Sequence, residues 1–75
     1  MQKIIDGFMY DTDVNVLLYT DTDKNRRYYM TTRQHFYVVF GNGDMKVVTA
    51  DFMRKFLGER DIAKYIEVFG TPKEG

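Results

Sequence analysis

Short apolar segments separated by polar turn residues fill the first 48 positions of the chain, a pattern typical of antiparallel strands. The segments 3–5 and 8–10 flank Asp6-Gly7, a pair that supplies the two positive-φ positions of a type I′ turn and so predicts a hairpin. The Gly-rich stretch 41–43 predicts a second hairpin turn. Further strands are predicted at 14–20, 27–32, 35–40 and 46–48. We therefore expect an antiparallel sheet of four or five strands.

After residue 48 the apolar residues recur at helical spacing. They are Phe52, Met53, Phe56 and Leu57 in the first segment and Ile62, Tyr65, Ile66 and Phe69 in the second. Thr49 and Asp61 are suitable N-caps, whereas Gly58 and Gly70 are predicted to end the two helices. The pattern predicts one α+β domain over residues 1–75, with both short C-terminal helices on one face of the sheet and a frayed tail at 72–75.

Composition narrows the class of protein. The chain has 75 residues and no Cys, so neither a disulfide nor a thiolate metal site can supplement a small core. No apolar run approaches membrane-spanning length and no secretion leader is visible, so we expect no membrane contact and a cytoplasmic location. The chain also lacks Ser, and its one His, His35, opens a predicted strand, so we do not expect an enzyme.

The net charge of zero conceals a segmented distribution. Residues 1–23 hold five Asp against Lys3 alone, a balance of −4, and residues 24–33 carry one Lys and three Arg, a balance of +4. If the fold keeps these segments apart, the molecule has an acidic and a basic side. Such a dipole suits a protein partner better than a uniformly negative polymer.

A DxDxN pattern occurs twice, at Asp11, Asp13 and Asn15 and again at Asp21, Asp23 and Asn25. Oxygen ligands at alternate positions begin an EF-hand loop, but such a loop also needs Gly at position 6 and Glu at position 12. Neither requirement is met, since these positions hold Val16 and Thr22 in the first copy and Arg26 and Thr32 in the second. Asp and Asn also accept bonds from nearby backbone N–H groups in turns. The pattern predicts two turns, with calcium binding as the alternative, and we expect no metal or cofactor.

Binding of single-stranded nucleic acid is a second functional hypothesis, because cations and aromatic residues are interleaved on two neighbouring strands. The stacking residues would be Tyr28, Tyr29 and Tyr37. Strand residues alternate between the two faces of a sheet, so only the aromatic side chains on the outer face could meet a base. The zero net charge also weakens the electrostatic attraction that such binding requires.

Several short motifs resemble those of small proteins carried by phages and other mobile elements. They are Ile4-Ile5-Asp6-Gly7, Tyr10-Asp11-Thr12, Tyr29-Met30-Thr31-Thr32, the turn 41–43 and Tyr65-Ile66-Glu67-Val68-Phe69-Gly70. The relatives have the pattern IxGxxYDT, YxT, GxGG and YxxxFG, and this chain departs from them at Val14, Asn15, Asn42 and Asp44. The resemblance implies a compact, non-enzymatic accessory protein, in a setting where inhibitors of host defence such as anti-CRISPR proteins are common.

The leading hypothesis is a protein-binding inhibitor of a bacterial CRISPR-Cas-type defence complex, located in the cytoplasm of the host. Its predicted contact residues are Asp11, Asp13, Asp21, Asp23, Arg26, Arg27 and Arg33. Single-stranded nucleic-acid binding is the alternative. A third hypothesis is a homodimer that pairs exposed sheet edges, so the chain is expected to be a monomer or a homodimer.

Overall fold

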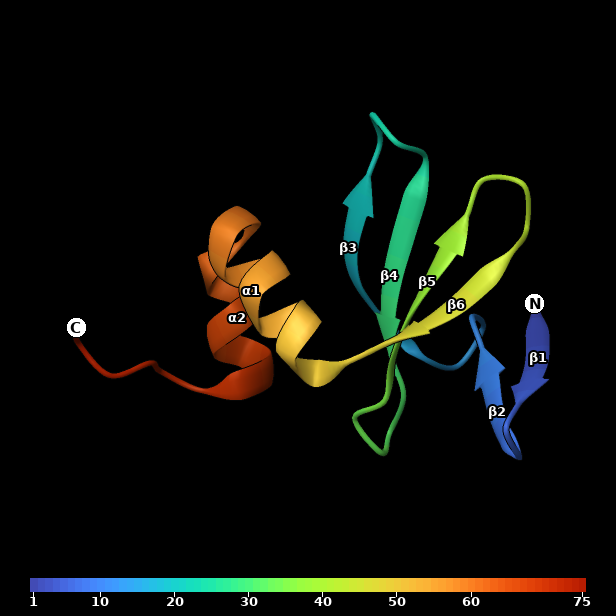
Figure 1. Ribbon diagram of the computed structural model, residues 1–75, viewed down its shortest axis with the longest axis horizontal. Helices are drawn as coiled ribbons and strands as arrows, with labels where there is room; N and C mark the ends of the chain where they lie inside the picture. The colour runs from blue at the N-terminus through green and yellow to red at the C-terminus, as the bar shows by residue number, and fades with distance from the viewer.

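A computed structural model describes residues 1–75 and contains six strands and two helices (Figure 1). The strands are β1 (Gln2–Ile5), β2 (Phe8–Asp11), β3 (Val16–Asp21), β4 (Arg26–Met30), β5 (Phe36–Phe40) and β6 (Met45–Val48), and the helices are α1 (Ala50–Arg60) and α2 (Ile62–Phe69). Strands β3 to β6 form a four-stranded antiparallel sheet in chain order. The predicted α+β class is confirmed. The first two strands do not extend this sheet and instead form a separate hairpin.

Local turn chemistry explains where the hairpins form. Asp6 and Gly7 have φ values of 52° and 81°, as a type I′ turn requires, and they join β1 to β2. Asn25 has a φ of 53° in the turn between β3 and β4, where Asn tolerates the left-handed region. Gly43, with a φ of 93°, belongs to the turn between β5 and β6. Both DxDxN segments are turns, as the sequence predicts.

The four-stranded sheet is covered on both faces because successive residues of β4 and β5 belong to different cores. One cluster faces the helices and contains Leu18, Tyr28, Phe36, Val38, Met53, Phe56 and Leu57. The other faces the β1–β2 hairpin and contains Tyr10, Tyr29, Tyr37, Val39 and Met45. The hairpin is thus a third layer, and in Figure 1 it lies away from the helices.

The predicted helix caps are confirmed, but one predicted helix end is wrong. The backbone N–H of Phe52 donates to Thr49 Oγ1 (3.0 Å), and that of Lys64 donates to Asp61 Oδ1 (3.1 Å). Gly58 was expected to end the first helix, yet α1 continues to Arg60. The backbone at Gly58 stays helical, and its bare Cα faces the ring of Tyr65 from α2. Gly58 therefore serves helix packing rather than termination.

The second helix uses only part of its predicted apolar face. Tyr65 and Phe69 pack against the helix-side core, whereas the side chains of Ile62 and Ile66 stay exposed. Gly70, with a φ of 89°, follows the end of α2 as predicted. Neither helix has the length and apolar character needed to cross a membrane.

Candidate functional site

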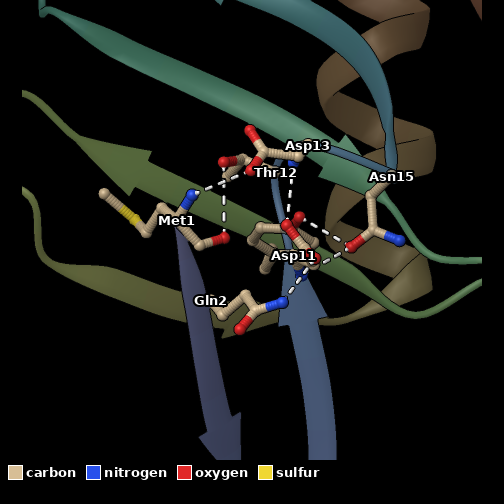
Figure 2. A network of polar contacts seen from close by, with 7 residues as sticks. Met1, Gln2, Asp11, Thr12, Asp13 and Asn15 are labelled. Atoms are coloured by element: carbon tan, nitrogen blue, oxygen red, sulfur yellow. Dashed lines mark hydrogen bonds and ion pairs between the residues drawn. The ribbon is translucent and has the colours of Figure 1, made fainter.

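The first DxDxN segment forms a polar turn that ties the hairpin to the chain that follows it (Figure 2). Asp11, only 8% exposed, accepts bonds at its two carboxylate oxygens from the Asp13 backbone N–H (2.9 Å) and from Gln2 Nε2 (3.0 Å). The backbone N–H of Thr12 donates to the Met1 carbonyl (3.0 Å). The Asp11 carboxylate is therefore held within the turn by bonds inside the protein, and its predicted contact with a partner stays a prediction.

Asn15 completes this turn and joins it to the main sheet. Its Oδ1 accepts from the backbone N–H of Asp11 (3.0 Å) and from the hydroxyl of Tyr37 (2.8 Å). Its own backbone N–H donates to the Asp11 carbonyl (2.9 Å). One side-chain oxygen thus connects β2, the loop before β3 and the second residue of β5.

Two groups in this network have shifted pKa values, for different reasons. The bond from Gln2 and the bond from the Asp13 backbone N–H lower the pKa of Asp11, against the opposing effect of burial. Burial raises the pKa of Tyr37 to about 12, and the nearby Tyr29 and Asp11 act in the same direction. Tyr37 therefore stays a neutral hydrogen-bond donor at physiological pH.

The second DxDxN segment is a simpler turn between β3 and β4. Asp21 Oδ1 accepts from the Lys24 backbone N–H (3.2 Å), and Asp23 is exposed. The side chain of Asn25 lies so close to Gly41 that a Cβ at Gly41 would overlap it. This contact joins the β3–β4 turn to the β5–β6 turn, and a side chain at position 41 would require Asn25 to move. No group of three or more His, Asp or Glu side chains in the protein is arranged to hold a metal ion.

The acidic and basic segments are not kept apart by the fold. β3 spans six residues, about 20 Å in a strand, so the two Asp pairs lie at opposite ends of it. Antiparallel pairing places Asp21 opposite Arg26. Arg33 follows β4 at its other end, beside Phe8 (5.9 Å from the guanidinium carbon to the ring centroid). The charge-segregated molecule expected from the sequence does not form, because a hairpin folds the two segments onto each other.

The three tyrosines proposed for base stacking are core residues. Tyr28, Tyr29 and Tyr37 are 3%, 6% and 0% exposed, respectively. Tyr29 and Tyr37 stack on each other (5.3 Å between ring centroids) beneath the hairpin, and Tyr28 packs on Phe56 of α1 (4.3 Å). None offers an exposed ring to a base, because both faces of the sheet are covered. The stacking prediction is wrong at these positions.

Apolar side chains remain exposed on the outside of the hairpin. Ile4 and Met9 are cross-strand partners and are 69% and 57% exposed, and Val14 is 73% exposed. Met9, Val14 and Arg33 line a hollow of about 330 Å³ between the hairpin and the β4–β5 turn. We call Ile4, Met9, Val14 and Arg33 the hairpin surface. Asp13, the residue before Val14, is exposed beside it.

A second exposed region lies between α1 and the sheet. Two neighbouring hollows, of about 380 and 400 Å³, share Arg26, Tyr28 and Phe52 among their lining residues. We call this region the α1 groove. Of the predicted contact residues it contains Asp21 and Arg26, whereas Arg27 is exposed outside it.

No protein-family model matches the chain, and neither a curated protein nor a solved structure matches it. Function is therefore inferred from the two exposed regions. Sequence reasoning missed the apolar members of the hairpin surface because an exposed Ile in a strand looks like a core Ile. It also missed Phe52, whose helical spacing predicted burial although its side chain is 44% exposed.

Proposed function

We propose that this chain is a non-enzymatic protein-binding module that inhibits a bacterial defence complex, of the CRISPR-Cas type, by covering a surface of its target. The observation that carries the proposal is the exposed apolar hairpin surface. Contiguous exposed apolar side chains bordered by polar ones are characteristic of protein-binding surfaces. The defence setting and the bacterial cytoplasm rest on the resemblance to mobile-element accessory proteins.

The hairpin that presents this surface is joined to the main sheet by a buried ring and by a polar network. On its inner side, Tyr10 is 3% exposed and meets the ring of Tyr37 edge-on (5.2 Å between ring centroids). At its end, the Asn15 and Asp11 network fixes the turn that leads into β3 (Figure 2). A rigid surface loses little conformational entropy on association, which favours affinity.

Charged residues beside the apolar side chains would orient the partner. Arg33 and Asp13 are exposed there, and no ion pair engages Arg33. Charges at the rim of an interface contribute mainly to association rate and specificity. Of the predicted contact residues, we retain Asp13 and Arg33 for this interface.

The test is an interference assay in bacteria that carry defined CRISPR-Cas systems, with phage plating efficiency as the readout. We expect the protein to restore plating against at least one system and to co-purify with a component of that system after nuclease treatment. The double variant Met9→Asp, Val14→Asp should lose inhibition, because a central interface residue contributes roughly 2 kcal/mol or more, about 30-fold in affinity.

The matched control is Ile62→Asp, which places the same charge at an exposed apolar position on α2, 65% exposed and outside the hairpin surface. It should inhibit as well as the unmodified protein. Failure to restore plating against every system in the panel would contradict the inhibitor proposal. Full inhibition by the Met9→Asp, Val14→Asp variant would contradict the assignment of the interface to the hairpin.

A further inference from the structure

The α1 groove gathers basic side chains, most of which form no ion pair within the protein. Five basic and two acidic residues line its two hollows, the basic ones being Lys24, Arg26, Lys46, Lys55 and Arg60. Of the two acidic residues, Glu59 forms an ion pair with Arg60 (3.6 Å), and Asp21 accepts from the Lys24 backbone N–H (3.2 Å). The other four cations belong to no ion pair. A locally positive groove thus exists in a chain of zero net charge.

The groove also presents the exposed end of an aromatic stack. The Phe52 ring is nearly parallel to Phe56 (23°, 5.7 Å between ring centroids) and to Tyr28 (28°, 6.4 Å). Tyr28 and Phe56 are buried, whereas the side chain of Phe52 is 44% exposed. Another planar ring could therefore extend the stack at Phe52. Aromatic faces of this kind bind unpaired bases with little dependence on sequence.

Arg26 is held where the two hollows meet. Its guanidinium carbon lies 5.1 Å from the centroid of the Phe40 ring. A guanidinium packed on an aromatic face keeps its N–H donors in a fixed plane, which suits phosphate oxygens. Lys24 and Lys55 line one of the two hollows that Phe52 borders, and Lys46 lines the other.

We propose that the α1 groove binds single-stranded nucleic acid, with a base stacked on Phe52 and phosphates beside Arg26 and the three unpaired lysines. A single strand fits better than a duplex because the bases of a duplex are already stacked on each other. It fits better than an acidic peptide because the groove combines its cations with an exposed ring. The α1 groove shares no residue with the hairpin surface, so this binding is a further activity that does not rest on the proposed inhibition.

The test is fluorescence anisotropy with a labelled oligothymidylate of about 12 nucleotides, within the site sizes of known single-strand binders. We expect saturable binding at low salt. Four phosphate contacts predict a slope of log affinity against log salt near −3, about a 50-fold loss between about 50 and 200 mM salt. Phe52→Ala should weaken binding about tenfold. Lys55→Gln changes an exposed residue and should reduce the slope by about 0.7.

Matched controls separate the groove from the rest of the surface. Arg27 is on the same strand as Arg26 but lies outside the groove, so Arg26→Gln should weaken binding and Arg27→Gln should leave it nearly unchanged. The double variant Met9→Asp, Val14→Asp alters the hairpin surface and should also bind normally. Circular dichroism melting verifies that each variant is folded.

Several results would overturn the proposal. The first is the absence of binding to the oligonucleotide at low salt, and the second is a loss of affinity in Arg27→Gln as large as that in Arg26→Gln. The third is an equal affinity for a duplex of the same length. The fourth is displacement of the oligonucleotide by polyglutamate as readily as by unlabelled oligonucleotide. The last of these would identify the groove as a site for acidic protein segments instead. If the unmodified protein inhibits a defence system but does not bind the oligonucleotide, only the proposal of nucleic-acid binding is contradicted.

Discussion

Asn15 shows how a single side chain can connect three parts of a small fold. Its Oδ1 accepts two hydrogen bonds, from the Asp11 backbone N–H and from the hydroxyl of Tyr37, which is fully buried. A buried hydroxyl that lacks a hydrogen-bond partner destabilises the folded state by its desolvation cost. The Asn15 amide therefore contributes to the stability of the fold as well as to the local turn.

We expect Asn15→Ala to lower the free energy of unfolding by about 1–3 kcal/mol, because it leaves the Tyr37 hydroxyl unpaired. Tyr37→Phe removes that hydroxyl, so the double variant should cost less than the sum of the two single variants. Urea denaturation measures all three. Asn42→Ala is the control, since Asn42 makes its turn bonds to Asp44 in an exposed loop. An Asn15→Ala effect no larger than that of the control would contradict this role.

Tyr37 also gives the protein a defined response to alkaline pH. Its pKa is raised to about 12 from the model-compound value of 10.0, so the folded state holds the phenol proton more tightly than the unfolded chain. The resulting stability is complete below pH 10 and is lost as pH rises from about 10 to about 12. Unfolding free energies across this range should fall more steeply for the unmodified protein than for Tyr37→Phe.

At the scale of elements, residues with a single local role were predictable from the sequence. Asp6-Gly7 determined the first hairpin turn and Thr49 capped the first helix, as the sequence predicted. Gly58 was misread because a Gly within a helical pattern looks the same whether it ends the helix or allows another element to approach. The ring of Tyr65 that it faces comes from the next helix, and this contact exists only in the folded chain.

The corrected role of Gly58 makes a prediction about stability. A Cβ added at this position would stand 3.7 Å from the Tyr65 ring, which is an ordinary contact, and the backbone is already helical. Gly58→Ala should therefore stabilise the protein by up to about 1 kcal/mol through helix propensity. Gly43→Ala should destabilise it, because Gly43 has a φ of 93°. Thermal melting compares the two, and destabilisation by Gly58→Ala would mean that α1 and α2 have no room for the methyl group.

At the scale of the whole molecule, the sheet is covered by two unlike layers, and this was not predictable. The periodicity of β5 indicated one core face, yet Tyr37 and Val39 are as deeply buried as Phe36 and Val38. Whether the outer face is covered depends on where the β1–β2 hairpin docks, and hairpin docking has no local sequence signal. The same reason explains why Tyr28, Tyr29 and Tyr37 could be mistaken for a binding surface. The α1 groove was missed for a related reason, because it is assembled from α1 and the sheet, and the packing of one on the other has no local sequence signal.

The hairpin layer should be separable from the rest, since β1 and β2 share no strand ladder with the main sheet. Tyr10→Ala removes its main buried anchor, at a cost typical of a large core truncation, about 3–5 kcal/mol. Hydrogen exchange should show lost protection in 2–11 with retained protection in α1. Tyr10→Phe keeps the ring and should behave normally. Equal loss of protection in α1 would show that the two layers unfold as one cooperative unit.

Successive side chains of β4 and β5 belong to different cores, and this determines which mutations the fold can tolerate. Substitutions at Phe36 or Tyr37 disturb one core each, whereas deleting a single codon within β5 would exchange the residues of both cores at once. Insertions and deletions are therefore expected to be tolerated better in the turns 22–25 and 41–44 than within β4 and β5. A library of single-codon deletions, scored for folded protein, would show these strands as the segments whose length cannot vary.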